Sequence, residues 1–188
     1  MKSILNIFGS PHKNGVTAIL NNCVLEHINQ YGLYVIYAYD RNVKPCIDCK
    51  KCAESEGCIF GDMDDIDLHL RQSDIIIIAT PIYNMCFPSP LKAILDRMQR
   101  YFMARFSLGL KPPIEKHKKM ILLATCGCDN KDEASVIEKQ LKRICTVINA
   151  DLVGTILWSG TDSDKFDVEL NIFNTHNKIK EILEKINY

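Results

Sequence analysis

Residues 74–79 read DIIIIA, a run that is apolar at every position after the first. An unbroken apolar run of this length is typical of a strand buried on both faces, as in a parallel sheet between two layers of helices. Similar short runs recur on both sides of it along the chain. The strands that we predict span residues 4–8, 33–39, 74–79, 120–125 and 152–158.

Helical patterns alternate with these strands. Between residues 16 and 30 the apolar side chains recur at intervals of three and four, and Gly32 follows as a stop signal. Five strands that alternate with five helices predict an α/β fold, a flavodoxin-like doubly wound parallel sheet of order 2-1-3-4-5 with helices on both faces. The length suits one domain over residues 1–188. The helices that we predict span residues 16–30, 65–72, 90–105, 133–149 and 169–186.

Composition and charge argue against several classes of protein. Lysine and arginine number 23, as do aspartate and glutamate, so the formal net charge is zero and indicates no surface for nucleic acid or for an acidic membrane. No segment approaches the roughly 20 apolar residues that span a bilayer, and the start of the chain lacks a small-residue cleavage site. We therefore expect a cytoplasmic protein, in which nine cysteines favour ligation or catalysis over disulfides.

The ligand site of such a sheet lies beyond the carboxyl ends of the strands, where the strand order reverses. The loops that meet there are residues 9–17, 80–89 and 125–130. The first enters a helix N-terminus, so its backbone N–H groups, with the hydroxyls of Ser10 and Thr17, can hold a phosphate. The second is rich in proline and aromatic residues and can form the wall of a flat, mostly apolar ring. A plain strand-to-helix turn and a loop that covers the core are the alternatives.

Four cysteines lie within residues 46–58, in a cysteine-rich loop at about 44–63 that reads PCIDCKKCAESEGC from residue 45. They are Cys46, Cys49, Cys52 and Cys58. Four thiolates at compact spacing suit a [4Fe–4S] cluster. Zinc also takes four thiolates, although its sites more often pair two C-x-x-C units at long separation. Reduced thiols that hold no metal are the third interpretation.

Two further cysteines, Cys126 and Cys128, flank Gly127. One intervening residue is poor spacing for a metal chelate. We therefore expect them to be small loop residues rather than a redox pair.

Three motifs together resemble the NADPH-dependent FMN reductase and iron–sulfur flavoprotein family. They are GSPHKNGVTA, the run CIDCKKCAESEGC followed by GDMDD, and ATPIYN followed by SPLKAILDR. The resemblance extends to about residue 130, and the rest of the chain fits the fold. It implies a flavodoxin-like fold, FMN as cofactor, NAD(P)H as co-substrate and a homodimer or tetramer.

The resemblance also implies roles for matching residues. Ser10, His12, Asn14 and Thr17 would hold the FMN phosphate, with Val16 in the same loop; Pro81, Ile82, Tyr83 and Asn84 would line the isoalloxazine and ribityl chain; Cys126 and Gly127 would approach the ring from the other side. Family members usually have Arg or Lys in place of His12 and Asn in place of Val16. Because histidine is only partly charged at neutral pH, this predicts a weaker or pH-dependent phosphate clamp.

These features predict a flavin-dependent oxidoreductase that passes electrons from NAD(P)H or a ferredoxin-type donor through FMN to a small-molecule or redox-protein acceptor, or to the cluster. The flavin supplies the chemistry, so no catalytic side chain is assigned. One alternative is a non-enzymatic flavodoxin-like carrier, against which the zero net charge argues, since such carriers are usually acidic. The other is a quinone or azo reductase whose cysteine loop has a structural role and holds either zinc or no metal.

Overall fold

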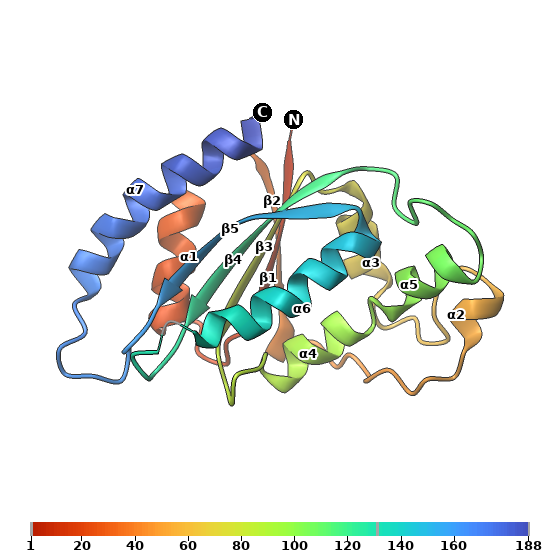
Figure 1. The fold of residues 1–188 in the computed structure, drawn as a ribbon, viewed down its shortest axis with the longest axis horizontal. Helices are drawn as coiled ribbons and strands as arrows, with labels where there is room; N and C mark the ends of the chain where they lie inside the picture. Colours follow the sequence, from red (N-terminus) through yellow and green to blue (C-terminus); the bar gives the residue numbers. More distant parts are fainter. Residues whose placement is uncertain (1, 131, 188) are drawn as a thin grey trace.

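The apolar run that begins at Ile75 forms the central strand of a five-stranded parallel sheet (Figure 1). The computed structural model describes residues 2–130 and 132–187. The strand order is β2-β1-β3-β4-β5, which confirms the predicted flavodoxin-like fold. The strands are β1 (Ser3–Phe8), β2 (Gly32–Tyr37), β3 (Ile75–Pro81), β4 (Lys118–Thr125) and β5 (Ala150–Trp158).

Helices cover both faces of this sheet. They are α1 (Val16–Glu26), α2 (Lys51–Glu54), α3 (Asp64–Gln72), α4 (Ser89–Asp96), α5 (Gln99–Phe106), α6 (Glu133–Ile148) and α7 (Val168–Asn187), with the 3₁₀ turn η1 (Ala38–Asp40). Figure 1 shows α1 and α7 together on one side of the sheet and the other long helices on the opposite side. Within the described residues, no helix combines the length and the apolar character needed to cross a membrane.

Burial of β3 on both faces follows from the alternation of its side chains. Ile76 and Ile78 join the core that α3, α4 and α6 cover, whereas Ile75 and Ile77 join the core under α1 and α7. All four side chains are at most 1% exposed. Each buried side chain of this size contributes roughly 1.5–3 kcal/mol relative to its exposed state, so the strand is held firmly in one register.

Two predicted helices differ from the structure: one ends early and the other is divided. α1 ends at Glu26 rather than near residue 30, because the N–H groups of His27 and Ile28 donate to carbonyls three residues back and tighten the chain into turns. The helix predicted over residues 90–105 is two helices, α4 and α5, separated by Arg97 and Met98. The interruption occurs where the Arg97 side chain turns inward to bind a distant loop.

β4 begins two residues before its predicted start, at Lys118. The Lys118 side chain is fully buried, and its ammonium donates a hydrogen bond to the carbonyl of Lys116. Desolvation, reinforced by the neighbouring charges of Lys116 and Arg71, lowers the pKa of Lys118 to about 8. A lysine at a strand start normally indicates exposure, which is why the sequence pattern missed this strand residue.

We predict that Lys118→Met stabilises the protein at pH 7. Between the folded pKa of about 8 and the ordinary value of 10.5, the unfolded chain holds a proton that the folded chain lacks, so the free energy of unfolding rises with pH in this window. Below it, the buried ammonium costs on the order of 3 kcal/mol, since each pKa unit corresponds to about 1.4 kcal/mol. Urea unfolding should show the variant to be more stable at pH 7 and the difference to shrink as the pH rises through this window toward 10.5. The exposed Lys139→Met is the control, and a difference that does not depend on pH would contradict the prediction.

Candidate functional site

The carboxyl ends of β1, β3 and β4 meet at one edge of the sheet, as the strand order predicts. The N–H of Gly9, after β1, donates to the Ala79 carbonyl of β3 (2.7 Å), and the N–H of Ile82 donates to the Thr125 carbonyl of β4 (2.8 Å). Only glycine fits at position 9, since a Cβ there would lie 2.5 Å from Leu91 Cδ2 of α4. The three loops therefore form one continuous surface on a rigid base.

The loop after β1 leaves the first amides of α1 open. Gly15 precedes the helix in an extended conformation, and no side chain caps it. The loop is closed by two short-range hydrogen bonds, from the His12 N–H to Ser10 Oγ (3.2 Å) and from the Gly15 N–H to the His12 carbonyl (3.2 Å). Residues 11–15 line a surface hollow next to these amides. Uncapped N–H groups at a helix N-terminus are a suitable site for an anion.

Side chains of this loop differ in their availability. His12 and Asn14 are exposed, whereas Ser10 and Thr17 are buried. The Thr17 hydroxyl is hydrogen-bonded to the hydroxyl of Thr125 at the end of β4 (2.7 Å). A ligand that binds the Thr17 hydroxyl would therefore have to share it with Thr125. Val16 packs against the core under α1, which leaves its backbone N–H as the group that can face a ligand.

Residues after β2 also reach this edge, which the sequence reasoning did not foresee. Lys13 Nζ lies 2.5 Å from Asp40 Oδ2 of η1 and 4.5 Å from the centre of the Tyr37 ring. Lys13 is the one lysine of the loop at residues 9–17, and Asp40 thus partly neutralises its charge. The signal available in the sequence was the strand order itself, since β2 lies next to β1.

The loop after β3 forms a tight two-residue turn. Tyr83 and Cys86 exchange two backbone hydrogen bonds (3.0 and 2.9 Å) around Asn84 and Met85, whose φ angles are 51° and 59°. Such a turn requires positive φ at both central positions, which is uncommon for methionine. Tyr83 and Met85 are nearly half exposed. Burial, and then the neighbouring Tyr83, raise the pKa of Tyr39 in η1. The segment after β2 and the loop after β3 therefore contribute aromatic side chains to one wall.

The loop after β4 brings two thiols together. Cys126 Sγ lies 3.1 Å from Cys128 Sγ, and both thiols contact the carboxylate of Glu133. Gly127 lies between them under Asp162, whose Oδ2 would be 2.2 Å from an added Cβ. A side chain at this position would have to displace the exposed carboxylate of Asp162. Sequence spacing gave no sign of this contact or of Glu133.

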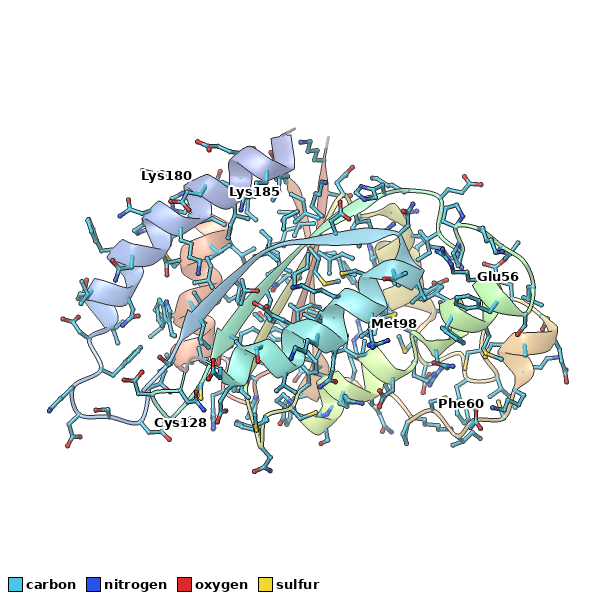
Figure 2. The ribbon with its side chains drawn as sticks, in the orientation of Figure 1. Glu56, Phe60, Met98, Cys128, Lys180 and Lys185 are labelled. Carbon is cyan, nitrogen blue, oxygen red and sulfur yellow. The ribbon has the colours of Figure 1, made fainter. Side chains whose placement is uncertain are left out.

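The four cysteines of the cysteine-rich loop line one hollow. Its walls also include Phe60, Arg97, Arg100 and Met103, from the end of the loop and from the α4–α5 region. Figure 2 shows Phe60 near α2 at the lower right of the molecule and Cys128 at the lower left, well separated from each other. In the part of the chain that the structure describes, one group of potential metal ligands has all its donor atoms within 4.8 Å of one another, and it is Cys126, Cys128 and Glu133. No three of the four loop thiols are that close.

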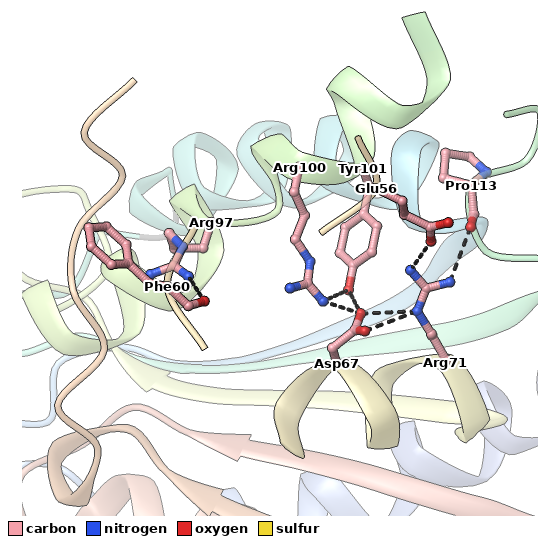
Figure 3. A network of polar contacts seen from close by, with 8 residues as sticks. All are labelled: Glu56, Phe60, Asp67, Arg71, Arg97, Arg100, Tyr101 and Pro113. Carbon is pink, nitrogen blue, oxygen red and sulfur yellow. Dashed lines mark hydrogen bonds and ion pairs between the residues drawn. The ribbon is translucent and has the colours of Figure 1, made fainter. Parts of the chain in front are cut away.

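Arg97 fixes both ends of the cysteine-rich loop, and Figure 3 shows its contact with Phe60 at one of them. Its side chain is 1% exposed, and its guanidinium donates to the carbonyls of Lys44 (2.9 Å) and Phe60 (3.1 Å). Nη1 also lies 3.0 Å from Asp62 Oδ1, and the other oxygen of Asp62 accepts the Lys44 N–H (2.8 Å). Arg97 Nε has no hydrogen-bond partner among the described residues. The loop is thus closed at its base by one buried cation.

A second network holds the far side of this loop. Arg71 pairs with Glu56 of the loop (2.6 Å) and with Asp67 of α3 (3.1 Å), and Asp67 also binds Arg100 and the Tyr101 hydroxyl (Figure 3). Burial works against ionisation of Asp67, but the hydrogen bond from Tyr101 and the charge of Arg100 hold its pKa below the usual range. The guanidinium of Arg100, which lines the hollow of the cysteine-rich loop, is therefore already paired with Asp67.

Comparison with known proteins identifies the family of this chain. Residues 2–164 match the family described as NADPH-dependent FMN reductase. The chain belongs to this family. An iron-sulfur flavoprotein from Methanosarcina thermophila is 26% identical over 191 residues, which cover 97% of this chain and 96% of that protein. Iron-sulfur flavoprotein MJ0731 from Methanocaldococcus jannaschii is 32% identical over 131 residues, which cover 68% and 63%.

Solved structures confirm the fold of this FMN reductase family member. An azoreductase from Bacillus anthracis str. Sterne superposes with a TM-score of 0.68 at 16% identity, covering 100% of this chain and 99% of that chain. The family resemblance and the enzyme class predicted from the motifs are confirmed: the protein is an oxidoreductase of the FMN reductase family. The individual site residues remain predictions.

We predict that Arg97→Met loosens the cysteine-rich loop. The variant loses the hydrogen bonds to Lys44 and Phe60 and leaves Asp62 without its cation, which should lower the free energy of unfolding by roughly 3 kcal/mol. Trypsin should cleave the folded variant faster at Lys50 and Lys51. Arg105→Met is the matched control, because Arg105 on α5 makes one exposed hydrogen bond, to Thr146. Equal cleavage of both variants would show that Arg97 does not hold the loop.

Proposed function

We propose that the protein is an FMN-dependent NAD(P)H oxidoreductase of the iron–sulfur flavoprotein type. The observation that carries the proposal is the meeting of three loops and the uncapped N-terminus of α1 at the edge where the strand order reverses. That edge offers amides for a phosphate next to an aromatic wall for a flat ring. Family membership supplies the cofactor, FMN, and the electron donor, NAD(P)H.

The residues at this edge fit FMN in two parts. The open amides at the start of α1, with Ser10, His12 and Asn14, would hold the phosphate. Pro81 to Asn84 and the loop at Cys126 and Gly127 would lie on either side of the ring. Bound FMN supplies hydride acceptance and transfer of one or two electrons. The chain itself would orient the ring with the 83–86 turn and would limit the access of water with aromatic side chains such as Tyr39.

The hollow of the cysteine-rich loop fits a polynuclear cluster better than a single zinc ion. Tetrahedral zinc with thiolates at 2.3 Å holds its sulfurs about 3.8 Å apart, whereas no three of the four loop thiols in the described chain lie within 4.8 Å of one another. Cys46, Cys49, Cys52 and Cys58 surround a common space. The guanidinium groups of Arg97 and Arg100 lie in its wall, each paired with an aspartate, so they would offset part of the negative charge of a thiolate-bound cluster. We propose a [4Fe–4S] cluster there.

The acceptor would be a flat aromatic small molecule, such as a quinone or an azo compound, or a redox protein. The exposed side chains of Tyr39, Tyr83 and Met85 give the edge an apolar opening that suits such a molecule. Nine free thiols fit a reducing compartment, so we propose the cytoplasm as its location. For a homodimer or tetramer, the exposed Phe102 and Phe106 on α5, whose tilted rings are in contact, offer an apolar surface.

We predict that His12→Arg strengthens FMN binding. A permanent charge beside the open amides should tighten binding by roughly 1 kcal/mol, about fivefold, because charge-assisted contacts with a phosphate are stronger than neutral ones. Titration of FMN fluorescence at constant ionic strength measures the change. His117→Arg is the control, since His117 pairs with Asp151 at the opposite end of β4. If both variants bind FMN like the parent protein, His12 does not face the phosphate.

We predict that Cys49→Ser removes iron and acid-labile sulfide while FMN stays bound. Anaerobically purified parent protein should show flavin bands over a broad shoulder that dithionite bleaches, with about four irons per chain. The control is Cys86→Ser, which removes a half-buried thiol outside the hollow. Stoichiometric zinc in the parent protein would replace the cluster proposal with a zinc site, and a protein without metal would leave an FMN reductase with free thiols.

A further inference from the structure

Cys126 and Cys128 are held in position for a bond between them. Their sulfurs are 3.1 Å apart, so closure to the disulfide distance of about 2.05 Å needs a movement of only about 1 Å. Backbone hydrogen bonds tie both residues to the strand and loop beyond: the Cys126 N–H donates to Trp158 (2.9 Å), and the Cys128 carbonyl accepts from Gly160 (2.9 Å). The pair is therefore a preformed unit on a rigid support.

The two thiols differ in their access to solvent. Cys126 is 3% exposed, whereas Cys128 is exposed. A thiol that exchanges with an external disulfide must be reached by it, and a thiol that resolves the resulting mixed disulfide need only reach its neighbour. The structure gives Cys128 the first position and Cys126 the second.

Glu133 serves both thiols. Its Oε1 accepts a hydrogen bond from Cys128 (3.2 Å) and its Oε2 accepts one from Cys126 (3.4 Å). Burial, with the contacts to Cys128 and Glu133, raises the pKa of Cys126 to about 12. Cys126 thus keeps its proton until a base beside it removes it, and the Glu133 carboxylate is the base in contact.

A metal site is the competing interpretation, because these three residues also bring their donor atoms within 4.8 Å of one another. Zinc at 2.3 Å from each sulfur would hold the sulfurs about 3.8 Å apart, and the observed separation is 3.1 Å. The pair is closer than zinc would hold it, which favours a bond between the sulfurs.

We propose that Cys126 and Cys128 form a redox-active dithiol that reduces an external disulfide, either a small thiol compound or a protein. Cys128 loses its proton to solvent, and its thiolate attacks one sulfur of the external disulfide; that S–S bond breaks, and the first thiolate leaves and takes up a proton from solvent. Cys126 then gives its proton to Glu133 as its sulfur attacks Cys128 Sγ. The S–S bond of the mixed disulfide breaks, the second thiolate leaves with the proton from Glu133, and the Cys126–Cys128 disulfide closes. The net change is one dithiol and one external disulfide converted to one internal disulfide and two thiols.

Regeneration of the dithiol requires two electrons and two protons. Reduced flavin is a two-electron donor of this class, and its proposed position at the same edge of the sheet would let it return the pair to the dithiol. This part of the inference rests on the proposed function. The exchange chemistry of the two cysteines does not, so the two can be tested separately.

The first test uses the full-length protein without FMN. Trypsin releases residues 120–131 as MILLATCGCDNK, which contains these two cysteines and no others. After equilibration with mixtures of oxidised and reduced glutathione, we expect this peptide to lose two hydrogen atoms and to resist alkylation, with a midpoint that shows two-electron dependence. Two free, alkylatable thiols at every ratio would overturn the proposal. Stoichiometric zinc that is lost in both single variants would overturn it in favour of a metal site.

The second test separates the roles of the two thiols. In Cys126→Ser, oxidised glutathione should leave a stable adduct on Cys128, because the resolving thiol is missing. Cys128→Ser should form no adduct on the buried Cys126, and Cys86→Ser should keep the disulfide. An adduct in Cys128→Ser and none in Cys126→Ser would overturn the assigned order of attack.

The third test joins the pair to the flavin. Addition of NADPH to the anaerobic, FMN-loaded, oxidised protein should return the peptide to two alkylatable thiols. If FMN binds and is reduced but the disulfide persists, the link to the flavin is wrong. If the protein does not retain FMN, the proposed function fails while the first two tests still decide the exchange chemistry.

Discussion

The structure depends on the burial of β3 on both faces. Because Ile75 and Ile77 point into one core and Ile76 and Ile78 into the other, a shift of this strand by one residue would exchange its side chains between two differently shaped layers. The register of β3 fixes where β1 and β4 end beside it, and hence where their loops meet. The edge where these loops meet, which is the proposed FMN site, is thus set by packing inside the two cores, which is why an apolar run could indicate the location of a polar site.

The position of the cysteine-rich loop is decided by a different force. That loop contributes little to either apolar core, and its base is fixed instead by the buried Arg97, which reaches two backbone carbonyls and Asp62. A buried guanidinium is costly unless it is paired and hydrogen-bonded. Satisfying it from the loop makes the closed loop geometry part of folding, and it interrupts the helix that the sequence pattern predicted as continuous. Metal ligation would therefore act on a loop that is already closed.

The sequence allowed the strand order, the three site loops and the family to be predicted, since each follows from periodicity or from a local motif. What it did not indicate depends on contacts between distant residues. Lys118 is polar in sequence but buried in β4, and Val16 turns into the core instead of toward a ligand. The contact of Cys126 with Cys128 was missed because the one-residue spacing was judged only as a metal chelate, for which it is unfavourable. A disulfide requires instead that the two sulfurs approach each other closely, and here they lie 3.1 Å apart.

The two groups of cysteines lie in different electrostatic surroundings. The hollow of the cysteine-rich loop has the guanidinium groups of Arg97 and Arg100 in its wall, each paired with an aspartate, Asp62 or Asp67. Burial and the neighbouring thiols raise the pKa of Cys52, so ionisation of these thiols would depend on the charge of a bound metal. Cys126 and Cys128 face the carboxylate of Glu133, which disfavours two thiolates and favours protonated thiols or a neutral disulfide. A thiolate-bound cluster would thus have two arginines near it at the first group and a carboxylate against it at the second. We expect the charge around each group, together with cysteine spacing, to separate the proposed metal ligation from the proposed thiol exchange.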